Sequence, residues 1–372
     1  MNAQPAEITL FGATGYTGQL IARALAREGL SFRLAGRSAE KLAALAGSLP
    51  GQPAWLTADA AQAASLPPLF QGTRLLINCA GPFTDLGERV IAQAAMSGVH
   101  YLDITNELGY VFRARGYHEM AKHSGAALLP SCAFEVALAD CAAHRAGSAL
   151  LDPANTQPLD EVHVVYALSG KGASQGTRRS AVRSLATSWV AYREGGWTGQ
   201  VPGGAVREFA LPNGSRHALS FPSCESITIP AHLPVRRVDT WMSATPGARF
   251  WAPVLVPLFA RLSRSILRGL ILKIANRGGF SPASSPEASL RADSPFTVYA
   301  QARQGSRARW TALLGQDPYG ITAEIITYAA RELVQPGYDR SGFLAPAQAF
   351  DPQAFLGYAQ ERWDIALREG NL

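Results

Sequence analysis

The chain has 372 residues, of which 47% are hydrophobic and 17% charged, so it can bury a large core and is not a disordered protein. Lys and Arg number 34 against 28 Asp and Glu, a net charge of +6. No run of five basic residues indicates a nucleic-acid-binding arm, so we expect no nucleic-acid partner. This length predicts two domains or one large one.

The cysteines and the N-terminus bear on the compartment. Four cysteines without a C-x-x-C pair are too sparse for a disulfide scaffold, and we expect reduced thiols and no structural metal. Residues 1–7 have neither a basic nor an apolar signal region. No apolar stretch reaches the ~18 residues of a membrane-spanning helix. We therefore expect a cytoplasmic protein.

The first 130 residues alternate short apolar strands with helical patterns. The expected strands are 7–11, 32–35, 54–57, 74–78, 101–102 and 127–129, and the expected helices are 19–28, 39–46, 87–97 and 110–124. This alternation predicts an α/β fold with a doubly wound parallel sheet. Ligands of such sheets bind at the carboxyl ends of the strands. We expect a Rossmann domain over 1–130 and an α+β domain over 131–372.

A glycine-rich loop directly follows the first expected strand. Residues 12–18 read G-A-T-G-Y-T-G and lead into the first expected helix. Gly12 allows the tight turn, Gly15 lets the backbone approach a pyrophosphate, and Gly18 lets the helix pack closely on the strand. The positive end of that helix then faces the phosphates. The alternative is a glycine-rich turn without a ligand.

The end of the second expected strand indicates which dinucleotide binds. An NAD site usually has an acidic residue there, whereas this chain has Gly36-Arg37-Ser38. Arg37 can pair with a 2′-phosphate, Ser38 can donate a hydrogen bond to it, and Lys41 adds positive charge. The pattern favours NADP(H) as cofactor. The alternative is that Arg37 is a solvated surface cation.

Several stretches in order resemble the saccharopine dehydrogenase-like oxidoreductases, and more narrowly their trans-acting enoyl reductase branch, which is tied to lipid metabolism. The matching stretches are Gly12–Gly18, Ala35–Ser38, Asn78–Phe83 and Tyr101–Glu107, followed by Gln175–Ser180, Gly315–Gly320 and Ser341–Ala347. The resemblance covers most of the chain and is most specific in the first ~130 residues.

The resemblance implies an N-terminal NADP-binding Rossmann domain and a second α+β domain. By match, the phosphates would be lined by Gly12, Thr14, Gly15, Tyr16, Thr17 and Gly18. Arg37 and Ser38 would take the 2′-phosphate, and Asp59 would lie near the adenine. The nicotinamide side would be approached by Cys79, Ala80, Gly81, Pro82 and Phe83.

The chain departs from the family pattern in two places. Asn106-Glu107 stands where the family has Gly-Glu, and Ala133-Phe134-Glu135 stands where it has Gly-Phe-Asp. Both places are where substrate is expected, so the resemblance does not fix the substrate.

The catalytic residue stays open at this stage. No tyrosine has a lysine four residues later, so the catalytic pair of short-chain dehydrogenases is absent from the sequence. The candidates near the expected crevice are Tyr101, Asp103, Glu107, Cys132 and Glu135. Alternatively, Asp103 and Glu107 cap the helix that begins near Tyr110, and Cys132 is a small buried residue.

A competing motif follows the strand expected at 162–168. Residues 172–176 read G-A-S-Q-G and precede a helical pattern at 177–192, the context of a nucleophile elbow. A hydrolase of that kind should not open with a dinucleotide loop, so a flexible turn is the favoured interpretation.

The second half contains a basic segment. Between Thr240 and Pro286 there is no acidic residue, and the basic ones are Arg249, Arg261, Arg264, Arg268, Lys273 and Arg277. In a helix, the apolar face would hold Leu255, Phe259, Leu262, Ile266 and Leu270, opposite Arg261, Arg264 and Arg268. The favoured interpretation is a helix packed in the core with a solvated arginine face. The alternative is that residues 251–277 dock on an anionic membrane or a carrier-bound acyl chain.

The rest of the chain predicts a second sheet. Its expected strands are 162–168, 207–210, 227–229, 296–302 and 308–314, the last two paired as a hairpin around Gly305. Helices are expected at 321–333 and 352–368, with residues 320–372 returning to the first domain. Exposed strand edges make a homodimer plausible.

Taken together, the patterns predict an NADP(H)-dependent oxidoreductase. Hydride would pass to or from a C=C or C=O of a small-molecule or acyl-type apolar substrate. Two alternatives stay open. One is a non-catalytic dinucleotide sensor, and the other is a peripheral membrane protein on a Rossmann scaffold.

Overall fold

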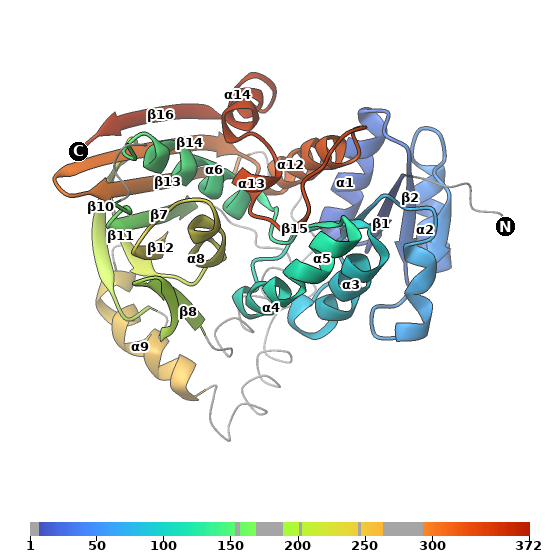
Figure 1. Cartoon of the computed structure of the whole chain (residues 1–372), viewed down its shortest axis with the longest axis horizontal. Helices are drawn as coiled ribbons and strands as arrows, with labels where there is room; N and C mark the ends of the chain where they lie inside the picture. The colour runs from blue at the N-terminus through green and yellow to red at the C-terminus, as the bar shows by residue number, and fades with distance from the viewer. Residues whose placement is uncertain (1–6, 153–156, 169–188, 201–202, 245–246, 263–292) are drawn as a thin grey trace. The chain divides into compact units, whose positions relative to one another are not determined.

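The computed structural model describes residues 7–152, 157–168, 189–200, 203–244, 247–262 and 293–372 (Figure 1). The chain divides into two compact units. The first combines 1–106, 110–137 and 319–350. The second combines 107–109, 138–318 and 351–372. A segment near the C-terminus, 319–350, therefore belongs to the same unit as the N-terminal strands.

The first unit is built on a seven-stranded parallel sheet of strand order β15-β6-β5-β4-β1-β2-β3. The strands are β1 (Ile8–Phe11), β2 (Phe32–Gly36), β3 (Trp55–Thr57), β4 (Leu75–Asn78), β5 (His100–Asp103), β6 (Ala127–Leu129) and β15 (Gly342–Phe343). Apart from the added β15, this is the order of a doubly wound dinucleotide-binding sheet. The predicted α/β fold class is confirmed.

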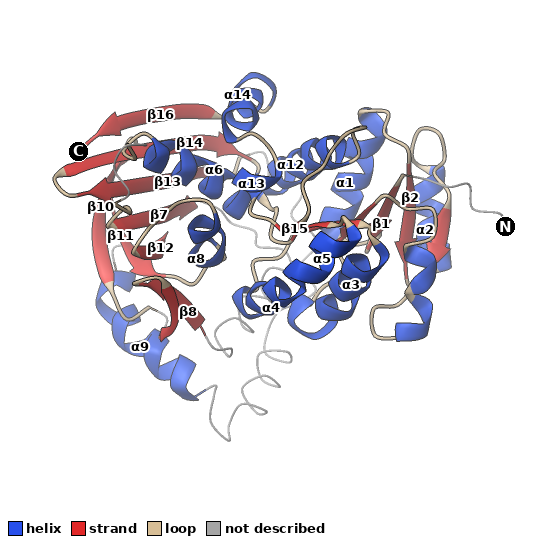
Figure 2. Cartoon of the chain, in the orientation of Figure 1, coloured by secondary structure: helices blue, strands red, loops and turns tan. Residues whose placement is uncertain are grey.

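Helices flank this sheet (Figure 2). They are α1 (Tyr16–Arg27), α2 (Ala39–Gly47), α3 (Phe83–Ser97), α4 (Leu108–Ala114), α5 (His118–Ser124), α12 (Pro318–Leu333) and α13 (Pro346–Ala349). One predicted helix is wrong in detail. The pattern at 110–124 is broken by a 3-10 turn at Arg115–Tyr117, which contains the poor helix former Gly116.

The sheet is buried on both faces, as all-parallel sheets are, and β1, β2 and β4 are buried along their whole length. Arg33 is the charged exception. Its guanidinium donates to the hydroxyls of Thr9 and Thr73 and to the carbonyls of three residues in 68–71. Neutral oxygens therefore satisfy a cation that is only 4% exposed.

The second unit contains a mixed sheet of order β10-β11-β12-β7-β13-β14-β16, with the β8–β9 hairpin attached to β12. The strands are β7 (Glu161–Leu168), β8 (Trp189–Arg193), β9 (Gly196–Gln200), β10 (Val206–Leu211), β11 (Gly214–Ser220), β12 (Arg237–Ser243), β13 (Pro295–Gln304), β14 (Arg307–Gln316) and β16 (Ala366–Asn371). β12 and β7 are parallel, and the other pairs are antiparallel. The predicted β13–β14 hairpin around Gly305 is confirmed.

The helices of this unit are α6 (Phe134–Ser148, which begins in the first unit), α8 (Glu225–Thr228), α9 (Ala248–Leu262) and α14 (Pro352–Arg362). The strand predicted at 227–229 is wrong, because these residues belong to α8 and the following 3-10 turn. The helix predicted at 352–368 ends at Arg362, and the edge strand β16 follows. Residues 189–192 of the helix predicted at 177–192 lie in strand β8. Residues 177–188 lie outside the described part.

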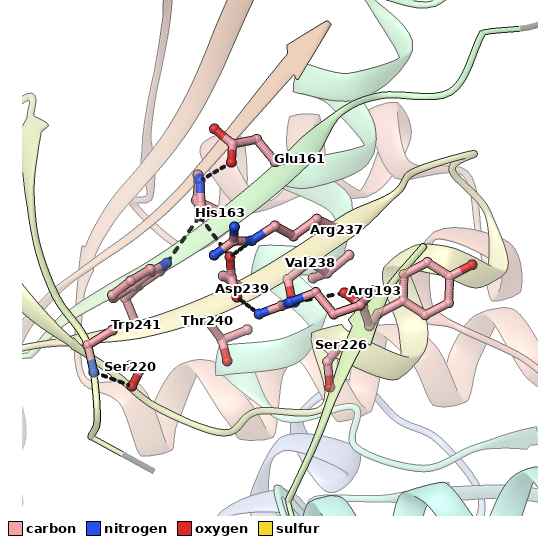
Figure 3. A network of polar contacts seen from close by, with 12 residues as sticks. Glu161, His163, Arg193, Ser220, Ser226, Arg237, Val238, Asp239, Thr240 and Trp241 are labelled. Carbon is pink, nitrogen blue, oxygen red and sulfur yellow. Dashed lines mark hydrogen bonds and ion pairs between the residues drawn. The ribbon is translucent and has the colours of Figure 1, made fainter. Parts of the chain in front are cut away.

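The two faces of the second sheet carry different contacts, because side chains alternate along each strand. On one face, Tyr166 of β7 donates a hydrogen bond to Glu225 of α8. On the other face, His163 lies 3.1 Å from Glu161 and 3.8 Å from Asp239. Figure 3 draws both contacts as dashed lines. The hydrogen bond with His163 lowers the pKa of Glu161 to about 2. The contact between His163 and Asp239 joins β7 to β12 in the middle of the sheet.

Within the described residues, no helix is both long enough and apolar enough to cross a membrane.

Candidate nucleotide and catalytic site

The glycine loop connects β1 to α1, and its geometry requires glycine. Gly12 has φ of +80°, and its amide donates to the Ala35 carbonyl at 2.9 Å. A Cβ on Gly12 would come within 2.6 Å of the Cys79 carbonyl carbon. A Cβ on Gly18 would come closer to the Gly12 carbonyl oxygen than real Cβ atoms do, and one on Gly15 would lie 3.2 Å from the same oxygen. The loop is therefore a bare backbone turn against the ends of β2 and β4.

Gly15 is the N-cap of α1, and the first turn of that helix holds no acidic residue. The first-turn amides of a helix have no intrahelical acceptors, so this end favours an anion. Thr14, Tyr16 and Thr17 are half-buried around it. Tyr16 stands edge-to-face to Tyr319 of α12, with ring centroids 5.1 Å apart. A phosphate group fits the charge and the steric openness of this turn.

The end of β2 presents Arg37 to solvent, and Arg37 forms no ion pair with an acidic side chain in the part of the chain that the structure describes. Ser38 is the N-cap of α2, where its Oγ accepts a hydrogen bond from the Lys41 amide at 3.3 Å. That bond leaves the hydroxyl proton of Ser38 available as a donor. After β3, Asp59 is half-buried and accepts from the Ala61 amide at 3.0 Å.

The loop after β4 lies against the glycine turn. The Cys79 amide donates to the Phe11 carbonyl at 2.7 Å, and the buried Asn78 side chain accepts from the Ala80 amide at 2.9 Å. Cys79, Ala80 and Pro82 are half-buried, and Gly81 is exposed. Burial and the nearby Asp103 raise the pKa of the Cys79 thiol. Cys79 therefore stays a neutral thiol rather than a nucleophilic thiolate.

Next to this loop, a buried carboxyl is held by two phenols. Asp103 Oδ2 accepts from the hydroxyls of Tyr101 and Tyr110, each at 2.9 Å. The two hydroxyls are 3.0 Å apart, and the Asn78 amide donates to Tyr101 at 3.0 Å. Asp103 Oδ1 accepts from the amides of Thr105 and Ser131 at 3.0 and 2.7 Å. Strands β4 and β5, helix α4 and the loop after β6 thus meet at one carboxyl.

Burial dominates the electrostatics of this cluster. It raises the pKa of Asp103 to about 6, although the four hydrogen bonds oppose the shift. Burial and the Asp103 carboxylate raise the pKa of both Tyr101 and Tyr110 well above the ordinary phenol value. Near neutral pH the cluster is one carboxylate accepting from neutral phenols.

The structure brings some of the predicted catalytic candidates together. Tyr101 and Asp103 share the cluster, and the amide of the fully buried Cys132 donates to the Asp103 carbonyl at 2.8 Å. Asp103 does not cap α4, because the backbone amides that it accepts from belong to Thr105 and Ser131, outside the helix, so that alternative is wrong for Asp103. Glu107 is buried just before α4, and Glu135 is half-buried in the first turn of α6.

Sequence reasoning missed two members of the cluster. Tyr110 was expected only as a helix start, and its seven-residue distance from Asp103 matches no motif. Ser131 has φ of +64°, an uncommon conformation for a residue other than glycine, and its Oγ donates to the Thr105 carbonyl at 2.6 Å. The available signal was that Ser131 is a polar residue two positions after the end of the buried strand β6.

Two further expectations have different outcomes. The G-A-S-Q-G motif at 172–176 lies outside the described residues. Within the described residues, no group of three or more His, Cys, Asp or Glu side chains is placed to hold a metal ion.

The nucleotide site coincides with a known domain family. Residues 8–129 match the model described as "Saccharopine dehydrogenase NADP binding domain". A Mycobacterium tuberculosis protein provisionally named trans-acting enoyl reductase is 33% identical over 197 residues, which is 50% of this chain and 46% of that protein. The trans-acting enoyl reductase of Mycobacterium ulcerans is 31% identical over 196 residues, 50% of this chain and 47% of that protein. The matches thus span about half the length of these relatives.

One solved structure resembles the whole chain. The apo histidine-tagged saccharopine dehydrogenase (L-Glu forming) from Saccharomyces cerevisiae superposes with a TM-score of 0.61 at 14% identity. The superposition covers 99% of this chain and 100% of that chain. At this identity the likeness shows the fold alone.

Proposed function

Residues 8–129 belong to the saccharopine dehydrogenase NADP-binding domain family, and from this premise we propose that the chain is an NADP(H)-dependent oxidoreductase acting on an apolar acyl-type substrate. The observation that carries the proposal is the glycine turn. Gly12 and Gly18 let the turn pack against the loop after β4 and against itself, where a Cβ would collide with backbone, and Gly15 leaves the exposed start of α1 without a side chain. The residues present therefore fit a dinucleotide pyrophosphate.

The choice of NADP(H) over NAD(H) rests on the end of β2. Gly36 is followed by Arg37, which is exposed and available, and no acidic side chain stands there for a ribose 2′-hydroxyl. A guanidinium matches a 2′-phosphate with charge-assisted, bidentate hydrogen bonds. Ser38 adds a hydroxyl donor at the start of α2.

When bound, NADPH supplies the hydride, and the protein supplies position and charge. Asn78 joins the loop after β4 to Tyr101 through one side chain that donates to the phenol and accepts from the Ala80 amide. Asp103 in turn holds Tyr101. Because Tyr101, Asp103 and Tyr110 are fully buried, we assign them as positioning residues for this loop rather than as groups that touch substrate.

The substrate class follows from the relatives and remains part of the proposal. The two mycobacterial proteins are named trans-acting enoyl reductases, so reduction of a C=C in an acyl chain is the first choice. Reduction of an acyl C=O is the second choice, since both reactions need hydride delivery to a polarised carbon.

The test is turnover with the purified chain. NADPH consumption would be followed with a panel of enoyl and ketoacyl thioesters, in wild type, Gly15→Val and the matched control Gly47→Val. Gly15 is exposed with an ordinary φ of −72°, and the one atom near an added Cβ is the Gly12 carbonyl oxygen at 3.2 Å, so valine there obstructs the phosphates and crowds the turn only slightly. Gly47 has no atom within 4 Å of an added Cβ and lies at the end of α2.

We expect turnover on at least one thioester, loss of turnover in Gly15→Val, and normal turnover in Gly47→Val. Unchanged activity of Gly15→Val would contradict the site. NADPH binding without turnover on any thioester would contradict the proposed reaction and favour a dinucleotide sensor.

A further inference from the structure

Helix α9 exposes an unusual number of large apolar side chains. Phe250 is 72% exposed, Trp251 52%, Val254 66%, Leu255 51% and Leu258 49%. They account for five of the ten large hydrophobic residues that are exposed in the described part of the chain. Scattered single apolar side chains on a surface are ordinary, whereas a contiguous group marks an interaction site.

The spacing of these residues makes one stripe. Phe250, Val254 and Leu258 follow each other at intervals of four, and Trp251 and Leu255 form the adjacent row. Residues four apart stack on the same side of a helix. The five side chains therefore form one continuous apolar surface along about two turns of α9.

The other side of α9 is the one that packs on the protein. Ala252 is buried, and helix α9 contacts strand β11. Val256 packs against Gly203, where an added Cβ would come within 2.7 Å of it. The helix is thus anchored through Ala252 and Val256, and the five exposed apolar side chains lie on its other side. For Leu255, the expected packing of this helix face in the core is wrong.

The stretch of sequence that contains this stripe carries charge of one sign. The sequence from 240 to 286 contains six basic residues and no acidic residue, and two of the six, Arg249 and Arg261, fall within the bounds of α9. A second copy of the chain would bring two such basic segments together, which like-charge repulsion disfavours. An anionic lipid surface attracts them instead.

We propose that α9 is a membrane-surface anchor that inserts its Phe250–Leu258 stripe into the interfacial layer of an anionic phospholipid bilayer. Aromatic and aliphatic side chains beside arginines are the composition of helices that lie in this layer. The 15 described residues of α9 are fewer than a bilayer-spanning helix needs, and their one-sided apolar stripe suits a helix that lies along the surface. An anchor of this kind would bring the chain to substrates that are themselves apolar.

The experiment is vesicle flotation with the full chain. Vesicles of phosphatidylcholine alone would be compared with vesicles containing roughly a third phosphatidylglycerol, at low and high salt. The apolar variant is Trp251→Ser with Leu255→Ser. Its matched control is Met96→Ser, another exposed apolar side chain, 56% exposed on α3. The charge variant is Arg249→Glu with Arg261→Glu.

We expect binding to the anionic vesicles only, weakened by high salt. The apolar variant should lower the partition coefficient at least tenfold, because two inserted side chains are lost, and the Met96 control should bind as wild type. The charge variant should lose binding to anionic vesicles.

Three results would overturn the proposal. They are absence of binding to either vesicle, binding that the apolar variant leaves unchanged, and a chain that self-associates through α9, shown by a wild-type dimer that the apolar variant turns into a monomer. All five substitutions lie on a helix surface or at a helix end, and circular dichroism of each variant checks that the fold is retained. The salt response of the wild-type chain tests the charge argument without any variant.

Discussion

The carboxyl of Asp103 should make folding less favourable as the pH rises from about 4 to about 6. Its pKa in the folded chain is about 6, against an ordinary value of 3.8. The folded state therefore binds the proton more tightly than the unfolded state, and the stabilisation is complete below the unfolded pKa. It is lost as the pH passes through the folded pKa. A shift of about two units corresponds to roughly 3 kcal/mol of unfolding free energy.

Asp103→Asn tests this directly, because an amide does not titrate. Urea unfolding would be measured at intervals from about pH 4 to pH 7.5 for wild type and variant. Glu225→Gln is the matched control, since burial also raises the pKa of Glu225, to about 7. In a plot of unfolding free energy against pH, Asp103→Asn should remove the part of the slope that lies below about pH 6. Glu225→Gln should remove the part that extends to about pH 7.

The comparison of slopes is robust to a general loss of stability. Asparagine cannot accept from all four donors that Asp103 satisfies, so the variant is expected to be less stable at every pH. That uniform loss shifts the curve without changing its slope. A variant slope equal to that of wild type between pH 4 and 6 would refute the assignment of a raised pKa to this carboxyl.

Three further outcomes follow from the first unit. Gly12→Ala should lower the free energy of unfolding in urea by about 2 kcal/mol or more beyond the loss in Gly29→Ala. Both glycines have a positive φ, but only Gly12 lacks room for a Cβ, so equal losses would contradict the close approach. Arg33→Met should lower the unfolding free energy by roughly 3 kcal/mol, since it strands several buried acceptors; a change below about 1 kcal/mol would contradict their burial. Arg27→Ala, which removes an exposed ion pair with Glu324, should shift the same free energy by less than about 1 kcal/mol.

The nucleotide half of the molecule could be predicted from its sequence because its signals are local. The turn between β1 and α1 is determined by consecutive residues, and the parallel strands are short apolar runs separated by helices. The direction of the strands then needs no further information, since the helical crossovers between parallel strands bring their carboxyl ends to one edge of the sheet. The position of Arg37 at the end of β2 follows from the same pattern.

The buried cluster around Asp103 could be predicted only in part, because its contacts are not local. Asp103 was a candidate, but its partners Tyr110 and Ser131 come from a helix and a loop that only the folded chain brings to it. A single sequence gives no sign of such a pairing. The predicted alternative, a helix cap, was the local explanation for an acid near a helix start.

The secondary structure of the second unit was harder to predict from sequence, for a different physical reason. Residues 225–228 are rich in strand-forming types and yet form α8, whose side chains are fully or nearly fully buried against the sheet. Tertiary packing overrides local propensity there. The edge strand β16 is mostly exposed and lacks the apolar alternation that identifies a half-buried strand. The sequence that follows α14 therefore predicts a longer helix than the structure contains.

The central claim is that the first unit holds NADP(H), and titration with NADPH and with NADH tests it most directly. Binding would be followed by energy transfer from tryptophan to the reduced nicotinamide, in wild type, Arg37→Ala and the control Arg23→Ala, an exposed arginine on α1. We expect wild type to prefer NADPH, and Arg37→Ala to weaken NADPH binding by roughly tenfold, about one charge-assisted contact, while leaving NADH binding and the control unchanged. Absence of binding to either nucleotide, or equal affinity for both in wild type, would contradict the account.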